Sequence, residues 1–466
     1  MRKRFFAATA CLVVGVGVPA ATLHFAALFG LVPDHGPGRA IAYVKDVLEL
    51  VHENYVDPAA VGYDDLAHSA IDGMVDSLDP HSEFLEAKDN QDLEEDLSGQ
   101  FGGVGIQVEV RGGKITVVNP MPGTPAERAG IRRGDEVVSI GGRAVSSAAA
   151  MDDVVDQLRG KPHTFVSLGV YRPSAGRRLS FRLERENINV DSVTNVHVVD
   201  RDIGYVLITE FSENTGQQFS DALGGLLKRN IDSLIIDLRN NPGGLLDSAV
   251  EVAEPFFRKG ELIVYTQGRK PSDREEFRSE NEGDPLDLPV AVLINEDTAS
   301  AAEIVTGALK DTGRAVIVGE RSFGKGTVQS IFKLRNGEGL RLTTAKYYTP
   351  SGISINDTGI SPEVKVVMTS AEDDDLRLQA ARPDITDPAE FKQEFGFEPI
   401  DDRQLDAAVA VLDGVDVLDS QAPRPPEPAK ATPPVPAQPA SARAAILPHH
   451  SNRPLRLSGA PRCDRG

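Results

Sequence analysis

The chain has 466 residues, of which 40% are hydrophobic, and this is enough material for two or three domains with buried cores. Its net charge at pH 7 is −21. Residues 421–466 carry seven Lys or Arg against two Asp or Glu, so this tail is +5 and the rest of the chain is −26. So acidic a body argues against a nucleic-acid partner.

The N-terminus has the pattern of an export signal. Three basic residues follow Met1, and an uncharged apolar run covers residues 5–32. Val18-Pro19-Ala20 is a candidate cleavage site, but the run is also long enough to span a bilayer as an uncleaved anchor. Residues 1–36 are therefore predicted to be a signal peptide or an inner-membrane anchor, which places the body in the periplasm or cell envelope.

Residues 37–97 are predicted to form a helical segment. Apolar residues recur on one helical face in Ala40–Tyr55 and again in Asp65–Leu78. A turn over residues 78–84 and an acidic helix, Lys88–Leu97, complete the segment. Its three histidines, at positions 52, 68 and 81, lack metal-site spacing and are interpreted as surface or packing residues.

Residues 98–184 form a β-rich module. A glycine-rich loop opens a strand, and a Gly-Gly hairpin turn, a helix over 151–158 and two further strands follow. This succession resembles a PDZ domain. The resemblance implies that Gly103, Val104, Gly105 and Ile106 bind the terminal carboxylate of a peptide, whose chain pairs with the following strand. The alternative is a glycine-rich hairpin in an unrelated β domain.

Residues 185–370 alternate between apolar strands and helices, which predicts an α/β core with a mainly parallel sheet. The expected strands are 203–208, 233–238, 261–266, 290–294, 315–319 and 327–334, and the expected helices are 215–228, 245–257 and 301–310. A charged loop is expected over 267–287. Residues 371–419 are predicted to be a C-terminal helical segment with a helix over 402–412, and the Pro/Ala-rich residues 420–466 to be disordered.

Candidate chemistry centres on Ser300 and Lys325. Ser300 lies at a strand-to-helix junction, where backbone N–H groups are free. No histidine occurs between Val198 and Pro448, and the two cysteines lie at the extremes of the chain. With no histidine, thiol or metal cluster at hand, a lysine remains as the base. It must be neutral, so burial has to lower its pKa from roughly 10.4.

Two further groups fit a Ser/Lys site. Gln329 is expected on the same strand face as residue 325, where its amide oxygen can accept a lysine N–H. The turn Asn241–Gly244 follows a buried strand, and its glycines free N–H groups for an oxyanion hole. The alternatives are that Ser300 only caps a helix and that Lys325 is a solvated loop residue. A third reading, the S-x-x-K pattern of Ser322 and Lys325, needs a helix that the neighbouring glycines oppose.

Four motifs occur in one order along the chain: Asp79–Ser82, Leu238–Gly244, Thr298–Glu303 and Gly324–Gln329. Together with the PDZ-like module they resemble the carboxyl-terminal processing proteases of the tail-specific S41 peptidase family. The resemblance implies an α+β multidomain protein with a crotonase-like or ClpP-like spiral core and an inserted PDZ domain. Ala302 departs from the family pattern, in which serine is frequent.

The same resemblance assigns roles. Ser300 is the expected nucleophile, Lys325 the general base and Gln329 the residue that orients the lysine. The expected oxyanion donors are the N–H groups of Ala301 and of Gly243 or Gly244. No metal or other cofactor is expected.

The predicted function is a serine endopeptidase that cleaves exported proteins selected by their C-termini through the PDZ domain. Its expected partners are protein substrates, and the sequence leaves open self-association or an adaptor protein. Because the PDZ module precedes the core directly, it is expected to regulate access to the site. The alternative function is a non-catalytic PDZ scaffold, or a ligand-binding protein, on an S41-like core.

Overall fold

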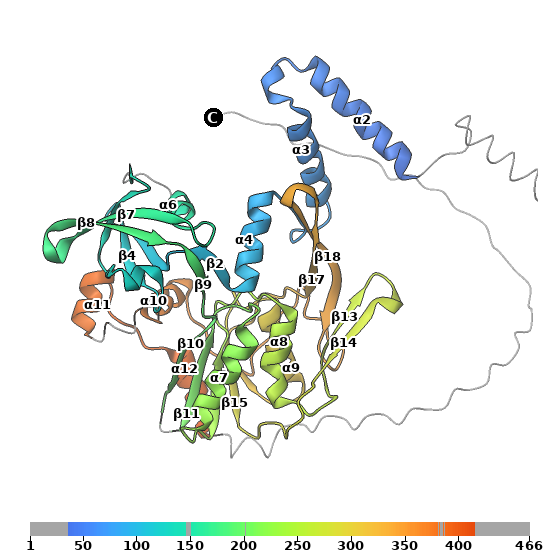
Figure 1. Ribbon diagram of the computed structural model, residues 1–466. Helices are drawn as coiled ribbons and strands as arrows, with labels where there is room; N and C mark the ends of the chain where they lie inside the picture. The colour runs from blue at the N-terminus through green and yellow to red at the C-terminus, as the bar shows by residue number, and fades with distance from the viewer. Residues whose placement is uncertain are drawn as a thin grey trace, which may run out of the picture. The chain divides into compact units, whose positions relative to one another are not determined.

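The computed structural model describes residues 36–145, 151–200, 202–380, 382, 385 and 387–414 (Figure 1). The predicted signal or anchor run, 5–32, and the predicted disordered tail, 420–466, lie outside the described residues. Within the described part of the chain, no helix is both long and apolar enough to cross a bilayer.

The N-terminal segment has the expected helices and one strand that was not expected. The helices are α2 (Pro37–Asn54), α3 (Tyr63–Asp76) and α4 (Ala87–Ser98). After the predicted turn comes the short strand β1 (Glu83–Leu85), which pairs antiparallel with β18 (Gly339–Tyr348). Three residues are too few to show a strand period in sequence, so only this long-range pairing reveals β1.

The β-rich module begins and ends in one two-stranded ribbon, made of β2 (Gln100–Gly103) and β9 (Glu186–Asn189). Between these strands lies a sheet in the order β3-β4-β5-β7-β8, with β6 pairing β5. Its elements are β3 (Ile106–Arg111), β4 (Lys114–Pro120), α5 (Pro125–Arg128), β5 (Glu136–Ile140), β6 (Arg143–Ala144), α6 (Met151–Leu158), β7 (Phe165–Arg172) and β8 (Arg177–Glu184). A separate cluster of buried side chains, including Val117, Val154 and Leu168, gives the module its own core.

The predicted mainly parallel sheet is present. Six strands lie in the order β10-β11-β12-β15-β16-β19, and only β10 and β11 pair antiparallel. They are β10 (Val193–Val198), β11 (Ile203–Ile208), β12 (Ser233–Asp237), β15 (Val290–Ile294), β16 (Val316–Gly319) and β19 (Val364–Lys365). The helices between them are α7 (Thr215–Leu227), α8 (Leu246–Ala253) and α9 (Ala301–Asp311), close to the predicted bounds.

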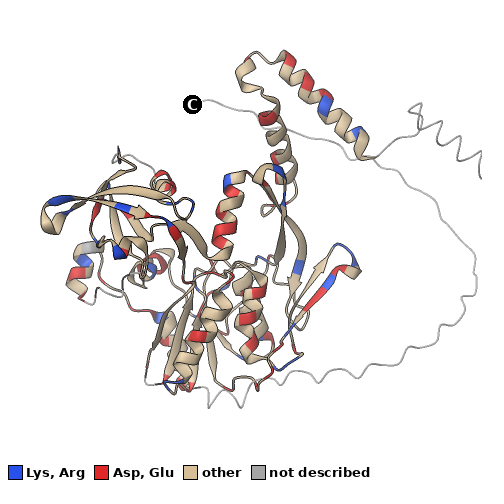
Figure 2. Ribbon diagram, viewed as in Figure 1, with Lys and Arg blue, Asp and Glu red and all other residues tan. Residues whose placement is uncertain are grey.

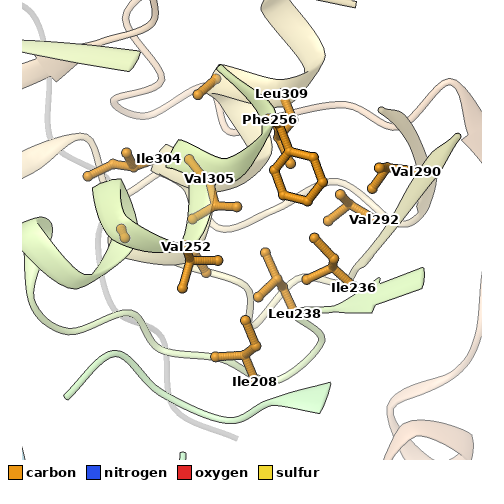
Figure 3. Close-up of a cluster of buried hydrophobic side chains, with 14 of the residues drawn as sticks. Ile208, Ile236, Leu238, Val252, Phe256, Val290, Val292, Ile304, Val305 and Leu309 are labelled. Atoms are coloured by element: carbon orange, nitrogen blue, oxygen red, sulfur yellow. The ribbon is translucent and has the colours of Figure 1, made fainter. Parts of the chain in front are cut away.

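Alternate residues of the central strands face opposite layers, as a two-residue strand period requires. Ile236 and Val292 pack with α8 and α9 in the cluster of Figure 3. Ile235 and Leu293 pack instead with residues of the C-terminal helix α12 (Arg403–Asp413). Both faces of the sheet are therefore covered, and its strands read as continuous apolar runs.

A second, antiparallel sheet has the order β1-β18-β13-β14, with β17 also pairing β18. It contains β13 (Leu262–Gly268), β14 (Arg274–Arg278) and β17 (Thr327–Lys333). The expectation of a loop over 267–287 is wrong in part, because β14 lies inside it. Four of the five β14 residues are charged and Phe277 alone is apolar, so no buried face is visible in the sequence. Two further helices, α10 (Ser370–Ala380) and α11 (Pro388–Phe395), lie in the predicted C-terminal helical segment.

Candidate active site

Ser300 occupies a sharp turn between β15 and α9. Its φ of 54° and ψ of −116° are unusual for a residue with a side chain, and such strain is concentrated at functional sites. The residue is half-buried, and its N–H donates to Glu303 Oε2 at 2.9 Å. The next N–H, of Ala301, is in the first turn of α9, where the helix itself offers no acceptor.

The turn after β12 lies against Ser300. A Cβ added at Gly243 would be 2.7 Å from Ser300 Cβ and 2.9 Å from Ala301 N, so only glycine fits there. The Gly243 N–H already donates to Asn241 Oδ1 at 2.8 Å. No partner of the Gly244 N–H is found among the described residues, so Gly244 is the freer of the two expected oxyanion donors.

Lys325 lies in an irregular segment before β17. Burial, and secondarily the positive charge of Arg341, lower the pKa of Lys325, against the opposing effect of the Glu303 carboxylate. Within the described part of the chain, Lys325 Nζ has no hydrogen bond or ion pair. Lys325 is thus half-buried, its amine has no hydrogen-bond partner among the described residues, and its lowered pKa favours the neutral form.

The S-x-x-K reading of Ser322 and Lys325 is not supported. Residues 320–326 form no helix, so these two side chains are not brought together as that motif requires. Ser322 Oγ instead donates to Glu303 Oε1 at 2.5 Å.

Glu303 connects the serine and the lysine. Its buried carboxylate accepts the N–H of Ser300 at 2.9 Å and the N–H of Lys325 at 2.8 Å, both at Oε2. These two nitrogens therefore lie no farther apart than two hydrogen-bond lengths. Burial raises the pKa of Glu303, although the hydrogen bonds that it accepts act in the opposite direction.

Tyr347 contacts the carbonyl groups of the same two residues. Its buried hydroxyl contacts Ser300 O at 3.0 Å and also the carbonyl oxygen of Lys325. Glu303 thus binds the N–H groups of Ser300 and Lys325, and Tyr347 contacts their carbonyl groups. Together the two side chains fix both main-chain segments. Neither residue is among the site residues predicted from the sequence. The S-x-x-E spacing of a capping box could have revealed Glu303, whereas no local pattern marks Tyr347.

Gln329 lies on β17 with its amide nitrogen engaged. Nε2 donates to Thr327 Oγ1 at 2.7 Å and, at 3.5 Å, approaches Thr343 Oγ1. Its Oε1 has no partner among the described residues, and no hydrogen bond joins it to Lys325 in this structure. A register shift between Val328 and Gln329 interrupts the strand alternation, so the expected shared face of 325 and 329 does not follow from strand period alone.

The turn after α3 also borders the site. The pKa of His81 is lowered by burial and then by the positive charge of Lys325, so this histidine is close enough to sense the lysine. The sequence predicts only a surface or packing role for this residue. Among the described residues, no group of three or more His, Cys, Asp or Glu has the arrangement of a metal site.

The predicted carboxylate-binding loop lies between β2 and β3. Gly105 has a φ of 73°, and a Cβ there would be 2.4 Å from Thr124. The N–H groups of Val104 and Gly105 have no partner among the described residues. The following strand, β3, is the edge of its sheet, so one side of its backbone is unpaired.

Comparison with known proteins identifies the families to which the two modules belong. The profile of peptidase family S41 matches residues 202–366, and the profile of the PDZ domain matches residues 102–185. A carboxy-terminal-processing protease of Bartonella bacilliformis is 39% identical over 394 residues, covering 81% of this chain and 89% of that protein. The chain belongs to the S41 peptidase family.

As an S41 member, the protein is a serine-type peptidase with mixed helix and sheet structure and a PDZ domain. A second S41 relative, named "Probable CtpA-like serine protease" in Staphylococcus aureus, is 36% identical over 326 residues, covering 69% of this chain and 64% of that protein. Among solved structures, the photosystem II D1 C-terminal processing protease is 30% identical, with 71% of this chain and 94% of that chain covered and a TM-score of 0.40.

Proposed function

We propose that the protein is an endopeptidase with a Ser/Lys catalytic dyad, in which Ser300 is the nucleophile and Lys325 the general base. The observation that carries this proposal is the Glu303 carboxylate, which accepts the N–H groups of both residues. One buried group thereby links two positions that are 25 residues apart in sequence. The crotonase-like spiral suggested by the sequence remains our proposal for the core topology.

In the proposed reaction, neutral Lys325 Nζ removes the proton of Ser300 Oγ as the oxygen attacks the scissile carbonyl. The developing oxyanion accepts the N–H of Ala301 and that of Gly244 or Gly243. The protonated lysine then gives its proton to the leaving amine, and an acyl-enzyme remains on Ser300. The same lysine then removes a proton from water, which attacks the ester, and it returns that proton to Ser300 Oγ as the acid product leaves. Gln329 Oε1 accepts an Nζ hydrogen and orients the amine.

Substrate selection is proposed to reside in the PDZ module. The free N–H groups of Val104 and Gly105, with Gly103 and Ile106 on either side, can hold a terminal carboxylate. The unpaired edge of β3 can extend its sheet with the residues before that carboxylate. The substrates are then exported proteins with accessible C-termini, which fits the apolar run at residues 5–32.

The test compares Ser300→Ala and Lys325→Ala with the wild-type protein on an unfolded substrate that has an apolar C-terminus. Loss of the nucleophile or of the base removes the chemical step, so kcat should fall by at least about a hundredfold in each variant. The matched controls are Ser330→Ala and Lys346→Ala on the neighbouring strands, which should cleave normally. His81→Asn tests the histidine whose pKa is lowered by burial and by the charge of Lys325.

Cleavage that survives Lys325→Ala would contradict the dyad. Cleavage that survives Lys325→Ala but not His81→Asn would assign the base to histidine. If Ser300→Ala and the wild-type protein both bind C-terminal peptides and neither cleaves, the protein is the scaffold that the sequence left as the alternative.

A further inference from the structure

The turn Asp79–Ser82 is joined to the catalytic region by side-chain hydrogen bonds. Asp79 Oδ1 accepts the N–H groups of His81 at 2.9 Å and Ser82 at 3.0 Å, while Oδ2 accepts Ser82 Oγ at 2.9 Å. The same Oδ1 accepts the Thr343 hydroxyl of β18 at 3.1 Å, and the Thr343 N–H donates to Ser82 Oγ at 3.1 Å. These hydrogen bonds between the turn and β18 all involve one residue of the strand, Thr343.

Thr343 is the cross-strand partner of Gln329. The two residues face each other in the β17–β18 ladder, and their side chains approach to 3.5 Å between Gln329 Nε2 and Thr343 Oγ1. A continuous series of polar groups thus runs from the Asp79 carboxylate through a hydroxyl to the amide that we assign to orient Lys325.

The chemistry of these three groups fixes which end of the amide faces Thr343. An ionised carboxylate only accepts hydrogen bonds, so the Thr343 hydroxyl must donate its one hydrogen to Asp79. Thr343 Oγ1 can then only accept from Gln329, which requires the amide nitrogen rather than the oxygen on that side. Burial alone would raise the pKa of Asp79, but the hydrogen bonds from His81, Ser82 and Thr343 outweigh it and lower that pKa, which keeps the carboxylate ionised.

Thr327 alone cannot determine the orientation of the Gln329 amide. Its hydroxyl accepts from Gln329 Nε2 at 2.7 Å, but the hydroxyl hydrogen has no acceptor of its own among the described residues. It could therefore rotate and donate to a flipped amide oxygen equally well. Only Thr343, held by Asp79, discriminates between the two amide orientations.

We propose that Asp79 and Thr343 are positioning residues of the peptidase: together they hold the Gln329 amide with its nitrogen toward β18 and its oxygen free for Lys325. This inference rests on the proposed role of Lys325 as base. It also means that the N-terminal segment contributes to the site, since Asp79 precedes β1 and is contributed by no element of the α/β core.

The experiment measures kcat and KM for Thr343→Val, Thr343→Ser and Asp79→Asn. Valine keeps the shape of threonine but removes the hydroxyl, so kcat should fall by about ten- to a hundredfold with KM nearly unchanged. Serine keeps the hydroxyl and should restore most of kcat. Asparagine can donate to Thr343 and thereby release the constraint, so Asp79→Asn should resemble Thr343→Val.

Matched controls are available on the same elements. Thr344→Val removes the hydroxyl of the next residue, which pairs with Ser330 at 2.7 Å, and should leave kcat unchanged. Asp76→Asn changes an exposed carboxylate three residues before Asp79 and should also be silent.

A double-mutant cycle with Gln329→Ala provides the decisive readout. If Asp79 and Thr343 act through the Gln329 amide, Thr343→Val should cause no further loss in the Gln329→Ala background. Additive losses, or a Thr343→Ser variant as defective as Thr343→Val, would overturn the inference. Either result leaves Ser300 and Lys325 untouched, whereas activity in Lys325→Ala would overturn the proposed dyad itself.

Discussion

At the scale of single residues, the protonation state of Lys325 decides when the proposed site is active. Burial and the charge of Arg341 favour the neutral amine, and the Glu303 carboxylate favours the protonated one. The pKa of His81, in the turn Asp79–Ser82, is lowered by burial and then by the charge of Lys325, so His81 also lies near the lysine. A general base is active only above its pKa, so these charges set the acid limb of the pH–rate profile.

Arg341→Met should move that limb to higher pH. Removing the positive charge makes the protonated lysine less unfavourable, so the pKa of Lys325 rises and a smaller fraction of the enzyme is competent at neutral pH. The measurement is kcat/KM against pH. Lys333→Met removes an equal charge from an exposed position on β17 and serves as the control. A shift to lower pH, or an equal shift in both variants, would contradict the assignment of the limb to Lys325.

At the scale of elements, the C-terminal helix α12 is fixed to the sheet by a buried arginine. Arg239 Nε donates to Asp237 Oδ1 at 3.0 Å, and its Nη2 donates to Asp402 Oδ2 at 2.8 Å. Asp402 is also the N-cap of α12 and accepts the Leu405 N–H at 3.0 Å. Because Arg239 immediately precedes the turn that contains Gly243, this network supports the site from the opposite layer of the sheet.

Arg239→Met should lower the free energy of unfolding by about 3–5 kcal/mol, because it leaves the buried Asp237 carboxylate and the half-buried Asp402 carboxylate without their cation. Urea unfolding followed by circular dichroism measures this loss. The control Arg377→Met breaks the exposed pair with Asp374, whose side chains are 65% and 64% accessible, and should cost less than about 1 kcal/mol. Comparable losses in the two variants would show that the Arg239 network does not stabilise the fold.

At the scale of the whole molecule, the PDZ module is connected through main-chain pairing. Gly103 of β2 lies opposite Glu186 of β9, so the chain enters and leaves the module at neighbouring positions. Acidic residues recur along α4, which ends just before this ribbon (Figure 2). Two of them pair with basic residues outside the helix, Glu94 with Lys333 and Glu95 with Arg159. Partly exposed pairs of this kind contribute little, so the ribbon is the main local constraint on the ends of the module.

Replacing residues 104–185 with Asn-Gly should therefore close β2 and β9 as a hairpin and leave the peptidase core folded. The wild-type protein should cleave a substrate with a free C-terminal carboxylate at least about tenfold faster than the same substrate amidated at its C-terminus. The shortened protein should lose this preference, since the loop Gly103–Ile106 is broken. A retained preference would place C-terminus recognition outside the PDZ module.

Local sequence was sufficient to predict those strands and helices whose own residues show an apolar run or a helical period. The structure has strands at 203–208 and 290–294 and a helix from Ala301, as the apolar runs and the helical period predict. These elements are predictable because each buries a continuous set of its own side chains. The sequence motifs were also sufficient to recognise a PDZ domain and the S41 peptidase family, which the profile matches show. The positions of Ser300 and Lys325 at element boundaries were likewise visible.

Only the tertiary structure revealed the contacts between distant segments. β1 is short, and only its pairing with the distant strand β18 makes it a strand. β14 is mostly charged and is a strand because it pairs with the neighbouring β13. Glu303, Tyr347 and Thr343 matter through hydrogen bonds to residues far along the chain, and no local period reports such a bond. The stretch from Ser300 to Gln329 supplies the reacting groups of the proposed site, while Gly243, β18 and the Asp79 turn, which hold them in place, come from elsewhere in the chain.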